Sequence, residues 1–269
     1  MPDRTGELFH LPGAVAVITG ATRGIGKQAA LALGRAGARV VLVGRTREDA
    51  PNAVLPGTLD SVLAEMTEQG IEARVVQADL SDVAQTQSIV DATLGWYGRC
   101  DVLVNNAAYN SNGPLLTVPA SRWEKAMRLQ VVAPMQLVQG FVPGMLERGS
   151  GRVVNVSSAA AVSLASGLSL YAVSKRAMER LNDYLHLELG GKGVSFNAFR
   201  IEKNVTTEGM RHVLATQGEA VVAMGGTLDL ISTEAVAEQL VWMVRRDARW
   251  SGHTVTCAQL ARWMETEGT

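Results

Sequence analysis

Short runs of apolar, mostly β-branched residues alternate along this chain with longer stretches of helical character. The runs cover residues 14–19 (AVAVIT), 39–43 (RVVLV), 73–78, 101–105, 152–156, 194–199 and 253–257. Most lack strict apolar–polar alternation, as expected of strands buried on both faces of a parallel sheet. The predicted helices lie near residues 25–36, 58–69, 82–97, 121–147, 169–189 and 233–246. This order predicts right-handed βαβ units in an α/β fold, with about seven parallel strands in one doubly wound sheet flanked by helices.

The spacing of the runs predicts a single domain over residues 1–269, because no linker-like segment divides them. Two connections are longer than βαβ units need, residues 46–57 and 200–232. Long connections in compact domains are often binding loops, and ligands of doubly wound sheets bind outside the carboxyl ends of the strands. We therefore expect residues 200–232 to form a substrate loop at that edge.

Composition narrows the classes of function. The net charge of −1 argues against a nucleic-acid footprint, and we find no uninterrupted apolar stretch long enough to span a membrane. The first ten residues carry acids and no apolar signal core, so we expect a cytoplasmic protein. Cys100 and Cys257 are expected to be buried thiols. The four scattered histidines have no ligand spacing, so no metal site is predicted.

The first strand runs directly into TGATRGIG, residues 19–26, and then into a helix. Gly20 can turn the chain sharply, while Gly24 and Gly26 let the backbone and the helix start approach a pyrophosphate. This strand–turn–helix context predicts a Rossmann-type NAD(P)-binding fold, in which Thr22 and Ile25 of the turn also contact the cofactor.

The end of the second strand predicts which dinucleotide binds. Gly44 stands where an NAD-binding chain usually has an acid for the ribose 2′-hydroxyl, and Arg45 and Thr46 follow it. Together with Arg23 of the glycine turn, these residues can bind a 2′-phosphate through charge-assisted hydrogen bonds. The alternative is that both arginines are solvated surface. We predict NADP(H) in preference to NAD(H).

With NNAA at 105–108, NVSS at 155–158 and YAVSK at 171–175, the chain resembles the short-chain dehydrogenase/reductase family over nearly its whole length. The resemblance implies a nicotinamide-dependent oxidoreductase that interconverts alcohols and carbonyls and forms a homotetramer or homodimer. The stretch after the second strand is also similar to the hydroxysteroid dehydrogenase-like branch. The resemblance implies catalytic roles for Ser158, Tyr171 and Lys175, and cofactor contacts from Asp79, Leu80, Asn105, Asn106, Ala107, Tyr171 and Lys175.

The spacing within YAVSK supports acid–base chemistry. Tyr171 and Lys175 are four residues apart, so they share one face of a helix. We expect the ammonium to lower the pKa of the phenol, and Ser158 at a strand end to reach the same carbonyl oxygen. Tyr171 would then give that oxygen a proton while Ser158 stabilises the developing charge.

Gln130 departs from the family pattern, which commonly has an asparagine that holds a proton-relay water near the lysine. Three alternatives follow for the longer amide side chain: a shifted relay that still works, a slower proton supply, or a cap on a helix bulge. We count Gln130 among the candidate catalytic residues.

A second departure follows the sixth strand, where Ile201-Glu202 replaces the usual Pro-Gly. Glu202 is either solvated or paired with Arg200 or a cationic substrate group. Because of the extra residue in this spacing, we predict that Thr207 rather than Thr206 contacts the nicotinamide carboxamide.

These features favour an enzyme that acts on a small or medium lipophilic carbonyl or alcohol. One alternative is a cofactor-binding regulator with little turnover, and another is a related enoyl reductase or epimerase. The partners expected are a small-molecule substrate and further copies of the chain, and neither nucleic acid nor a membrane.

Overall fold

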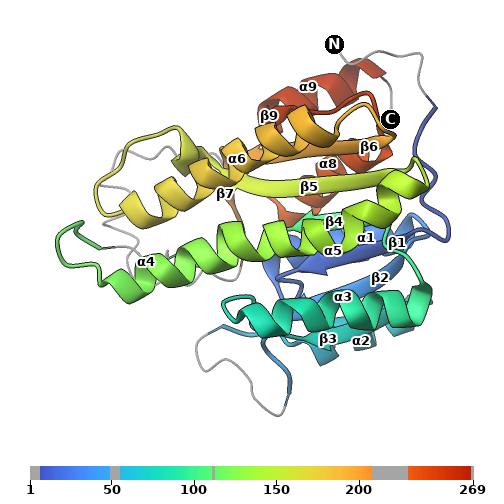
Figure 1. Ribbon diagram of the computed structural model, residues 1–269, viewed down its shortest axis with the longest axis horizontal. Coiled ribbons are helices and arrows are strands. Elements are labelled where there is room, and N and C mark those ends of the chain that lie inside the picture. Colours follow the sequence, from blue (N-terminus) through green and yellow to red (C-terminus); the bar gives the residue numbers. More distant parts are fainter. Residues whose placement is uncertain (1–6, 49–54, 111–112, 208–229, 268–269) are drawn as a thin grey trace.

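Seven parallel strands form one sheet in the order β3-β2-β1-β4-β5-β6-β9 (Figure 1). The computed structural model describes residues 7–48, 55–110, 113–207 and 230–267. The strands are β1 Val15–Thr19, β2 Arg39–Gly44, β3 Ala73–Gln77, β4 Val102–Asn105, β5 Gly151–Ser158, β6 Val194–Ile201 and β9 Thr254–Thr256. The prediction of a doubly wound parallel sheet is confirmed.

Helices cover both faces of the sheet. One layer contains α3 (Val83–Tyr97), α5 (Ala133–Glu147) and α6 (Ser169–Leu189), which lie in front of the sheet in Figure 1. The other contains α1 (Gly24–Arg35), α2 (Leu59–Glu68), α8 (Thr233–Arg245) and α9 (Cys257–Glu267). Each layer has its own apolar cluster against the sheet, so the strands between them are buried on both sides.

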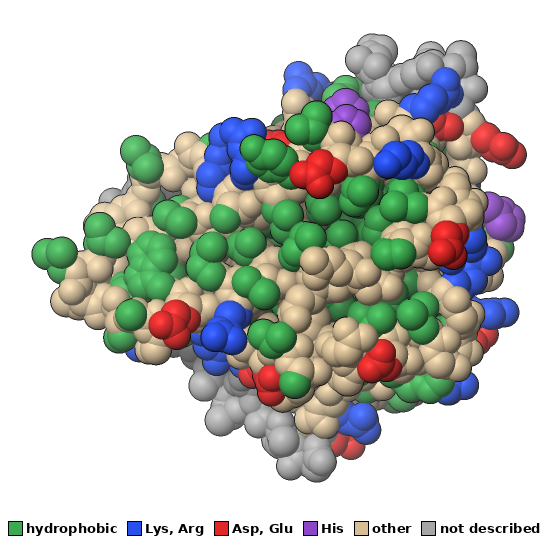
Figure 2. Space-filling view, in the orientation of Figure 1, with side chains coloured by type: hydrophobic (Ala, Val, Ile, Leu, Met, Phe, Trp, Pro, Cys, Tyr) green, Lys and Arg blue, Asp and Glu red, His purple; other side chains and the backbone are tan. Residues whose placement is uncertain are grey.

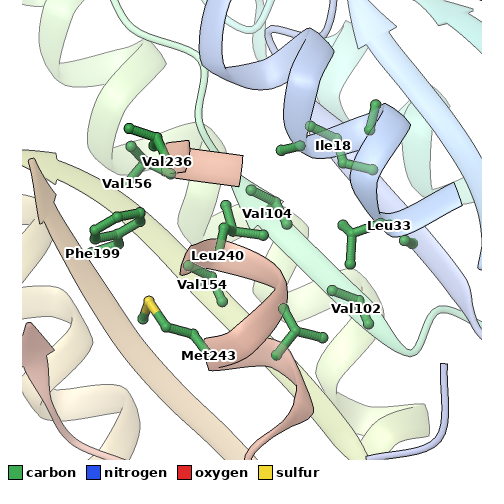
Figure 3. Packing of buried hydrophobic residues seen from close by; sticks show 14 of the residues in the cluster. Ile18, Leu33, Val102, Val104, Val154, Val156, Phe199, Val236, Leu240 and Met243 are labelled. Carbon is green, nitrogen blue, oxygen red and sulfur yellow. The ribbon is translucent and has the colours of Figure 1, made fainter. Parts of the chain in front are cut away.

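Figure 3 shows how α8 packs against the middle of the sheet. Leu240 and Met243 lie against Val104, Val154 and the neighbouring strand residues, all of them buried. Burying a side chain of this size contributes about 1.5–3 kcal/mol to the free energy of unfolding. Repeated over both layers, this burial fixes the strand register and therefore the edge where the strands end.

The functional edge follows from the strand order. β1 pairs with β2 on one side and with β4 on the other, so the chain reverses its direction of winding between them. Ligands of such sheets bind outside the carboxyl ends of the strands at this reversal. The residues that follow β1, β4 and β5 are therefore brought together.

The helix before β5 is a single continuous segment over 28 residues, Ala120–Glu147. It consists of α4 (Ala120–Met127), one π-helical turn, η1 (Arg128–Val132), and α5. By length and composition alone it could cross a membrane, although Gln130, Gln136 and Gln139 interrupt its apolar residues. Half of its most apolar window is buried inside the fold, where Gly140 lies against Val90, and core helices pass the same test.

Some boundaries differ from those predicted. The last strand ends at Thr256, because Cys257 begins α9, a helix that the apolar pattern did not predict. A short 3-10 turn, η2 (Ala159–Ala161), follows β5, and β7 (Asn204–Val205) pairs with β8 (Leu230–Ile231). The third strand lies at the sheet edge and is only partly buried, so it is not covered on both faces as expected.

Candidate active site

The glycine turn packs against the end of β4. Gly20 has φ of +68°, and a Cβ added there would lie 2.9 Å from Ala107 Cα. A Cβ on Gly26 would lie 2.2 Å from the Gly20 carbonyl oxygen. Gly24 also has a positive φ, +53°. Only glycines permit this close packing, and the cradle fits the phosphates of a dinucleotide at the start of α1.

Asn106 holds the same turn from the side of β4. Its Nδ2 donates to the Thr19 carbonyl at 2.8 Å, and the Ala107 N–H donates to Thr19 Oγ1 at 3.0 Å. Ile25 packs against the apolar cluster, and Thr22 is buried beneath the turn. Asn106 and Ala107 therefore lie beside the glycine turn and help to shape it, and their contact with the cofactor stays a prediction.

The residues predicted to select NADP(H) lie close together. Arg23 Nη2 donates to Thr46 Oγ1 at 3.3 Å, so the glycine turn reaches the end of β2. A Cβ at Gly44 would lie 2.8 Å from Thr22 Cγ2, which leaves little room for an acid there. Arg45 faces Asp79 with 3.6 Å between Nη1 and Oδ2.

Asp79 lines a pocket with Arg45, Gln77, Ala78 and Gln85. Burial raises the pKa of its carboxyl, but hydrogen bonds from Ser81 and the charge of Arg45 lower it below the usual value. Leu80, the next residue, is buried. The pocket thus offers an anionic and a cationic side chain at the end of β3, next to Thr46 and Arg23.

Tyr171 and Ser158 meet at the end of β5. Ser158 Oγ accepts from Ala160 N at 3.3 Å, which fixes the hydroxyl at the start of η2. Burial raises the pKa of Tyr171, and a hydrogen bond with Ser158 opposes that shift. The phenol is therefore protonated at neutral pH.

Lys175 lies on the same face of α6, one turn after Tyr171. Its Nζ donates to the Val156 carbonyl at 2.6 Å and lies 5.8 Å from the centre of the Tyr171 ring. Burial lowers the pKa of Lys175 to about 8, and the charge of Glu179 opposes this. We expected the ammonium to lower the pKa of Tyr171. In the structure burial has the larger effect and raises that pKa instead.

Gln130 is fully buried within the π-helical turn η1. Its Oε1 accepts from Tyr109 N at 2.7 Å, and its Nε2 donates to Ser174 Oγ. The amide thus bridges the loop after β4 and the residue preceding Lys175. The bulge of the third alternative is present, but the Gln130 side chain binds Tyr109 and Ser174 rather than capping it.

Glu202 is exposed and caps a helix rather than pairing with Arg200. Its two carboxylate oxygens accept from Cys257 N and Ala258 N, both at 2.8 Å, and so cap the N-terminus of α9. Arg200 pairs instead with Glu179. The hypothesis of a partner for Arg200 is therefore corrected: Glu202 is exposed, as the solvated alternative expected, and its carboxylate is favourable near the N–H groups of a helix start.

Thr207 follows β7, and its N–H donates to Val205 O at 2.7 Å. The Thr206 N–H donates to Ile231 O at 3.0 Å, so Thr206 belongs to the β7–β8 pair. The contact of Thr207 with the nicotinamide carboxamide stays a prediction. The rest of the predicted substrate loop, residues 208–229, lies outside the described residues.

Three buried polar residues behind the site were missed. Asn155 accepts from Asn105 Nδ2 at 2.9 Å and donates to Asn182 Oδ1 at 3.0 Å, so Asn105 does join the central strands. Glu179 is 2% exposed and lies one turn after Lys175. The sequence contained signs of Asn155 and Glu179: an asparagine within an apolar strand, and a carboxylate four residues after a lysine.

Residues 14–217 match the profile of the short chain dehydrogenase family. The chain belongs to this family. It is therefore an oxidoreductase by descent, with the seven-stranded fold of its relatives. Within the described residues, no group of three His, Cys, Asp or Glu side chains could hold a metal ion.

Among curated relatives, the glycine betaine reductase ATRR of Emericella nidulans is 31% identical over 252 residues. That match covers 91% of this chain but only 19% of the relative. The 3-oxoacyl-[acyl-carrier-protein] reductase of Synechocystis is 32% identical over 189 residues, covering 70% of this chain and 73% of the relative. Both relatives are named as reductases.

Solved structures agree. A putative NAD(P)-dependent gluconate 5-dehydrogenase from Beutenbergia cavernae, with bound NADP, is 29% identical, with a TM-score of 0.81 over 92% of this chain and 96% of its own. A variant of actinorhodin polyketide ketoreductase, with NADPH, is 27% identical, with a TM-score of 0.81 over 91% of this chain and 95% of its own. Both similar structures therefore contain the phosphorylated dinucleotide.

Proposed function

We propose that this short-chain dehydrogenase is an NADP(H)-dependent oxidoreductase that interconverts a carbonyl and an alcohol on a small or medium lipophilic substrate. The observation that carries the proposal is the arrangement of Ser158, Tyr171 and Lys175 at the carboxyl end of β5. Burial keeps the Tyr171 phenol protonated, so it can serve as the proton donor when a carbonyl is reduced.

The chain's own residues supply the acid and its support. Tyr171 donates its proton to the carbonyl oxygen, and the Ser158 hydroxyl donates a hydrogen bond that stabilises the charge developing there. Lys175, held by the Val156 carbonyl, stabilises the phenolate that remains. When bound, the nicotinamide cofactor supplies the hydride.

Several chain residues would hold the cofactor. The glycine turn would receive the pyrophosphate, and Arg23, Arg45 and Thr46 would bind the 2′-phosphate of NADP(H). The close contact of Gly44 with Thr22 supports this choice, because an acid for the NAD ribose has little room. The NADP and NADPH in the two similar structures support it further.

Two loops beside Tyr171 support a lipophilic substrate. The Gly113 N–H donates to Gly167 O at 2.9 Å, which joins the loop after β4 to the loop after η2. These loops expose Leu115, Leu116 and Leu164, the last two almost completely. Apolar side chains of this kind favour a substrate with a hydrocarbon part, such as the acyl chain of the Synechocystis relative's named substrate.

We further propose a homodimer or homotetramer. Figure 2 shows a broad apolar face over α5 and α6. Val173, Tyr184 and Leu187 of α6 have exposed side chains, as does Val132 of η1. A soluble chain rarely leaves such a face uncovered, and a second copy presents a matching one. A cytoplasmic location is consistent with the free buried thiols of Cys100 and Cys257.

Cofactor titration tests the first half of the proposal. We expect the purified chain to bind NADPH more tightly than NADH in fluorescence titrations. Arg45→Gln should weaken NADPH by about tenfold or more, the value of one charge-assisted hydrogen bond, and leave NADH unchanged. Tighter binding of NADH by the native chain would refute the assignment of Gly44 and Arg45.

A carbonyl screen tests the second half. Oxidation of NADPH should be measured with aldehydes, ketones and acyl thioesters of increasing chain length. Tyr171→Phe should reduce turnover about 10²–10⁴-fold while NADPH binding is retained. Undiminished turnover in Tyr171→Phe would refute the mechanism. Tight NADPH binding without turnover on any carbonyl would favour a regulator instead, and turnover on activated alkenes alone would favour an enoyl reductase.

A further inference from the structure

A buried carboxylate lies behind the catalytic helix. Glu179 is 2% exposed and lies on α6, four residues after Lys175. Its Oε1 accepts from Ser157 Oγ at 2.8 Å, which ties α6 to β5. Because ionised side chains are almost never fully buried without partners, this position calls for a role.

Two arginines complete the surroundings of Glu179. Arg200 on β6 donates through Nε and Nη2, both at 2.8 Å, in a bidentate pair. Arg176 Nη1 donates at 3.1 Å from the solvent side. Burial raises the pKa of Glu179, but the hydrogen bonds from Arg200, Ser157 and Arg176 outweigh it and lower the pKa below the usual value. The carboxylate is therefore charged.

The partners of Glu179 belong to the elements that carry the site. Ser157 directly precedes Ser158, and Ser157 and Arg200 are register partners on β5 and β6. The helix that carries Glu179 also carries Tyr171 and Lys175. One carboxylate thus connects the strand of the catalytic serine, the catalytic helix and the strand that leads to Thr207.

Lys175 needs a negative charge nearby. It is 1% exposed, and the Val156 carbonyl that accepts its hydrogen bond carries no negative charge. Burial lowers its pKa to about 8, and the charge of Glu179 opposes that shift. Around this pair, α6 contributes Arg176, β6 contributes Arg200 with Glu202 after it, and the π-helical turn presents the neutral Gln130.

We propose that Glu179 is a positioning residue that keeps Lys175 in its charged form, and that Arg200 limits how much of the carboxylate's charge acts on the lysine. The catalytic role of Lys175 rests on the function proposed above, whereas its charge state does not. The two neighbours act in opposite senses: loss of the carboxylate disfavours the ammonium, and loss of the guanidinium favours it.

The charge of Lys175 can be measured without a substrate. The chain contains five lysines, Lys27, Lys125, Lys175, Lys192 and Lys203, so labelling lysine with ¹³C at Cε gives a simple NMR spectrum of the whole protein. Lys175→Met identifies the Lys175 signal. Its titration midpoint is then read from spectra between pH 6 and pH 11, with the fold checked at each pH by circular dichroism.

We expect Glu179→Gln to move the Lys175 midpoint to lower pH by about one unit or more, a tenfold loss of proton affinity. Arg200→Gln should move it to higher pH, and Glu179→Asp should restore it toward the native value. Asp183→Asn is the matched control: it removes an exposed carboxylate, paired with Arg180, from the same helix, and should leave the midpoint unchanged.

An unchanged Lys175 midpoint in folded Glu179→Gln would overturn the proposal and leave Glu179 a purely structural tie. If that variant does not fold, Arg200→Gln decides, since no shift or a shift to lower pH would equally overturn it. These outcomes are independent of turnover. A chain without reductase activity can still show the shifts, and an active reductase can lack them.

Discussion

Up to Tyr97, the polar side chains buried among the described residues are all threonines, whereas from β4 onward they include asparagines and charged groups. The first region forms the glycine turn, proposed to hold the cofactor, through close backbone packing at Gly20 and Gly26. The second surrounds Tyr171 with the chain Asn105–Asn155–Asn182 and with Lys175 and Glu179. The region before β4 thus depends on glycines that leave space for close backbone packing. The region from β4 onward depends on buried polar side chains that pair with one another.

The two regions should therefore be sensitive to different kinds of substitution. A phosphate cradle needs backbone N–H groups at a fixed place, and any Cβ displaces them. An acid–base site needs a set charge on particular groups, and buried partners set it. Substitutions in the first half should therefore act through space, and substitutions in the second through hydrogen bonds and charge.

The largest effect is expected for Gly26→Ala. The new Cβ would lie 2.2 Å from the Gly20 oxygen and 2.4 Å from Asn106 Nδ2, so the turn must move. We expect the free energy of unfolding to fall by about 3 kcal/mol, as for severe overpacking, and NADPH binding to be lost. Urea unfolding and NADPH titration measure the two.

Gly95→Ala is the matched control in α3, since nothing lies within 4 Å of a Cβ there. It should stabilise the chain by about 0.5–1 kcal/mol through helix propensity and leave NADPH binding unchanged. If both alanine variants behaved alike, close packing would not explain the cradle.

The second prediction concerns pH and Lys175. Its pKa falls from 10.5 to about 8 on burial, so between these values the unfolded chain binds a proton that the folded chain has lost. Stability from this group therefore rises with pH across that window. Relative to Lys175→Met, the native free energy of unfolding should increase by about 3 kcal/mol from pH 8 to pH 10.5. A constant difference between the two proteins would contradict the burial of an ionisable lysine.

How much the sequence predicts also differs between the halves. The glycine turn could be predicted because each glycine is required by close local packing. The apolar runs predicted the seven strands because helices cover both faces of the sheet. The strand ending at Thr256 was extended to Cys257, because a buried cysteine at a helix start has the same apolar character as a strand residue. The pattern near the chain end was too short to reveal α9.

The catalytic half was predicted only in part. Tyr171 and Lys175 are local in sequence, but the Arg200–Glu179 pair joins residues 21 apart, and Glu202 meets its partners 55 and 56 residues away. No spacing rule connects such groups before the strands are in register. A helix bulge at Gln130 was only one of three alternatives, because nothing in RLQVV distinguishes a π-helical turn from an α-helix before the helix packs.

The smallest of the three effects is expected for Asn155→Ala. Asn155 is 1% exposed, and its loss leaves Asn105 Nδ2 and Asn182 Oδ1 buried without these partners. An unsatisfied buried group costs about 1–3 kcal/mol, so we expect a loss of about 2 kcal/mol in urea unfolding, with NADPH affinity largely retained. Gln87→Ala removes an exposed amide, paired with Asp91, and should change stability by less than about 0.5 kcal/mol. Equal losses in both variants would mean that the hydrogen bonds of the buried amide side chains contribute nothing measurable to the free energy of unfolding.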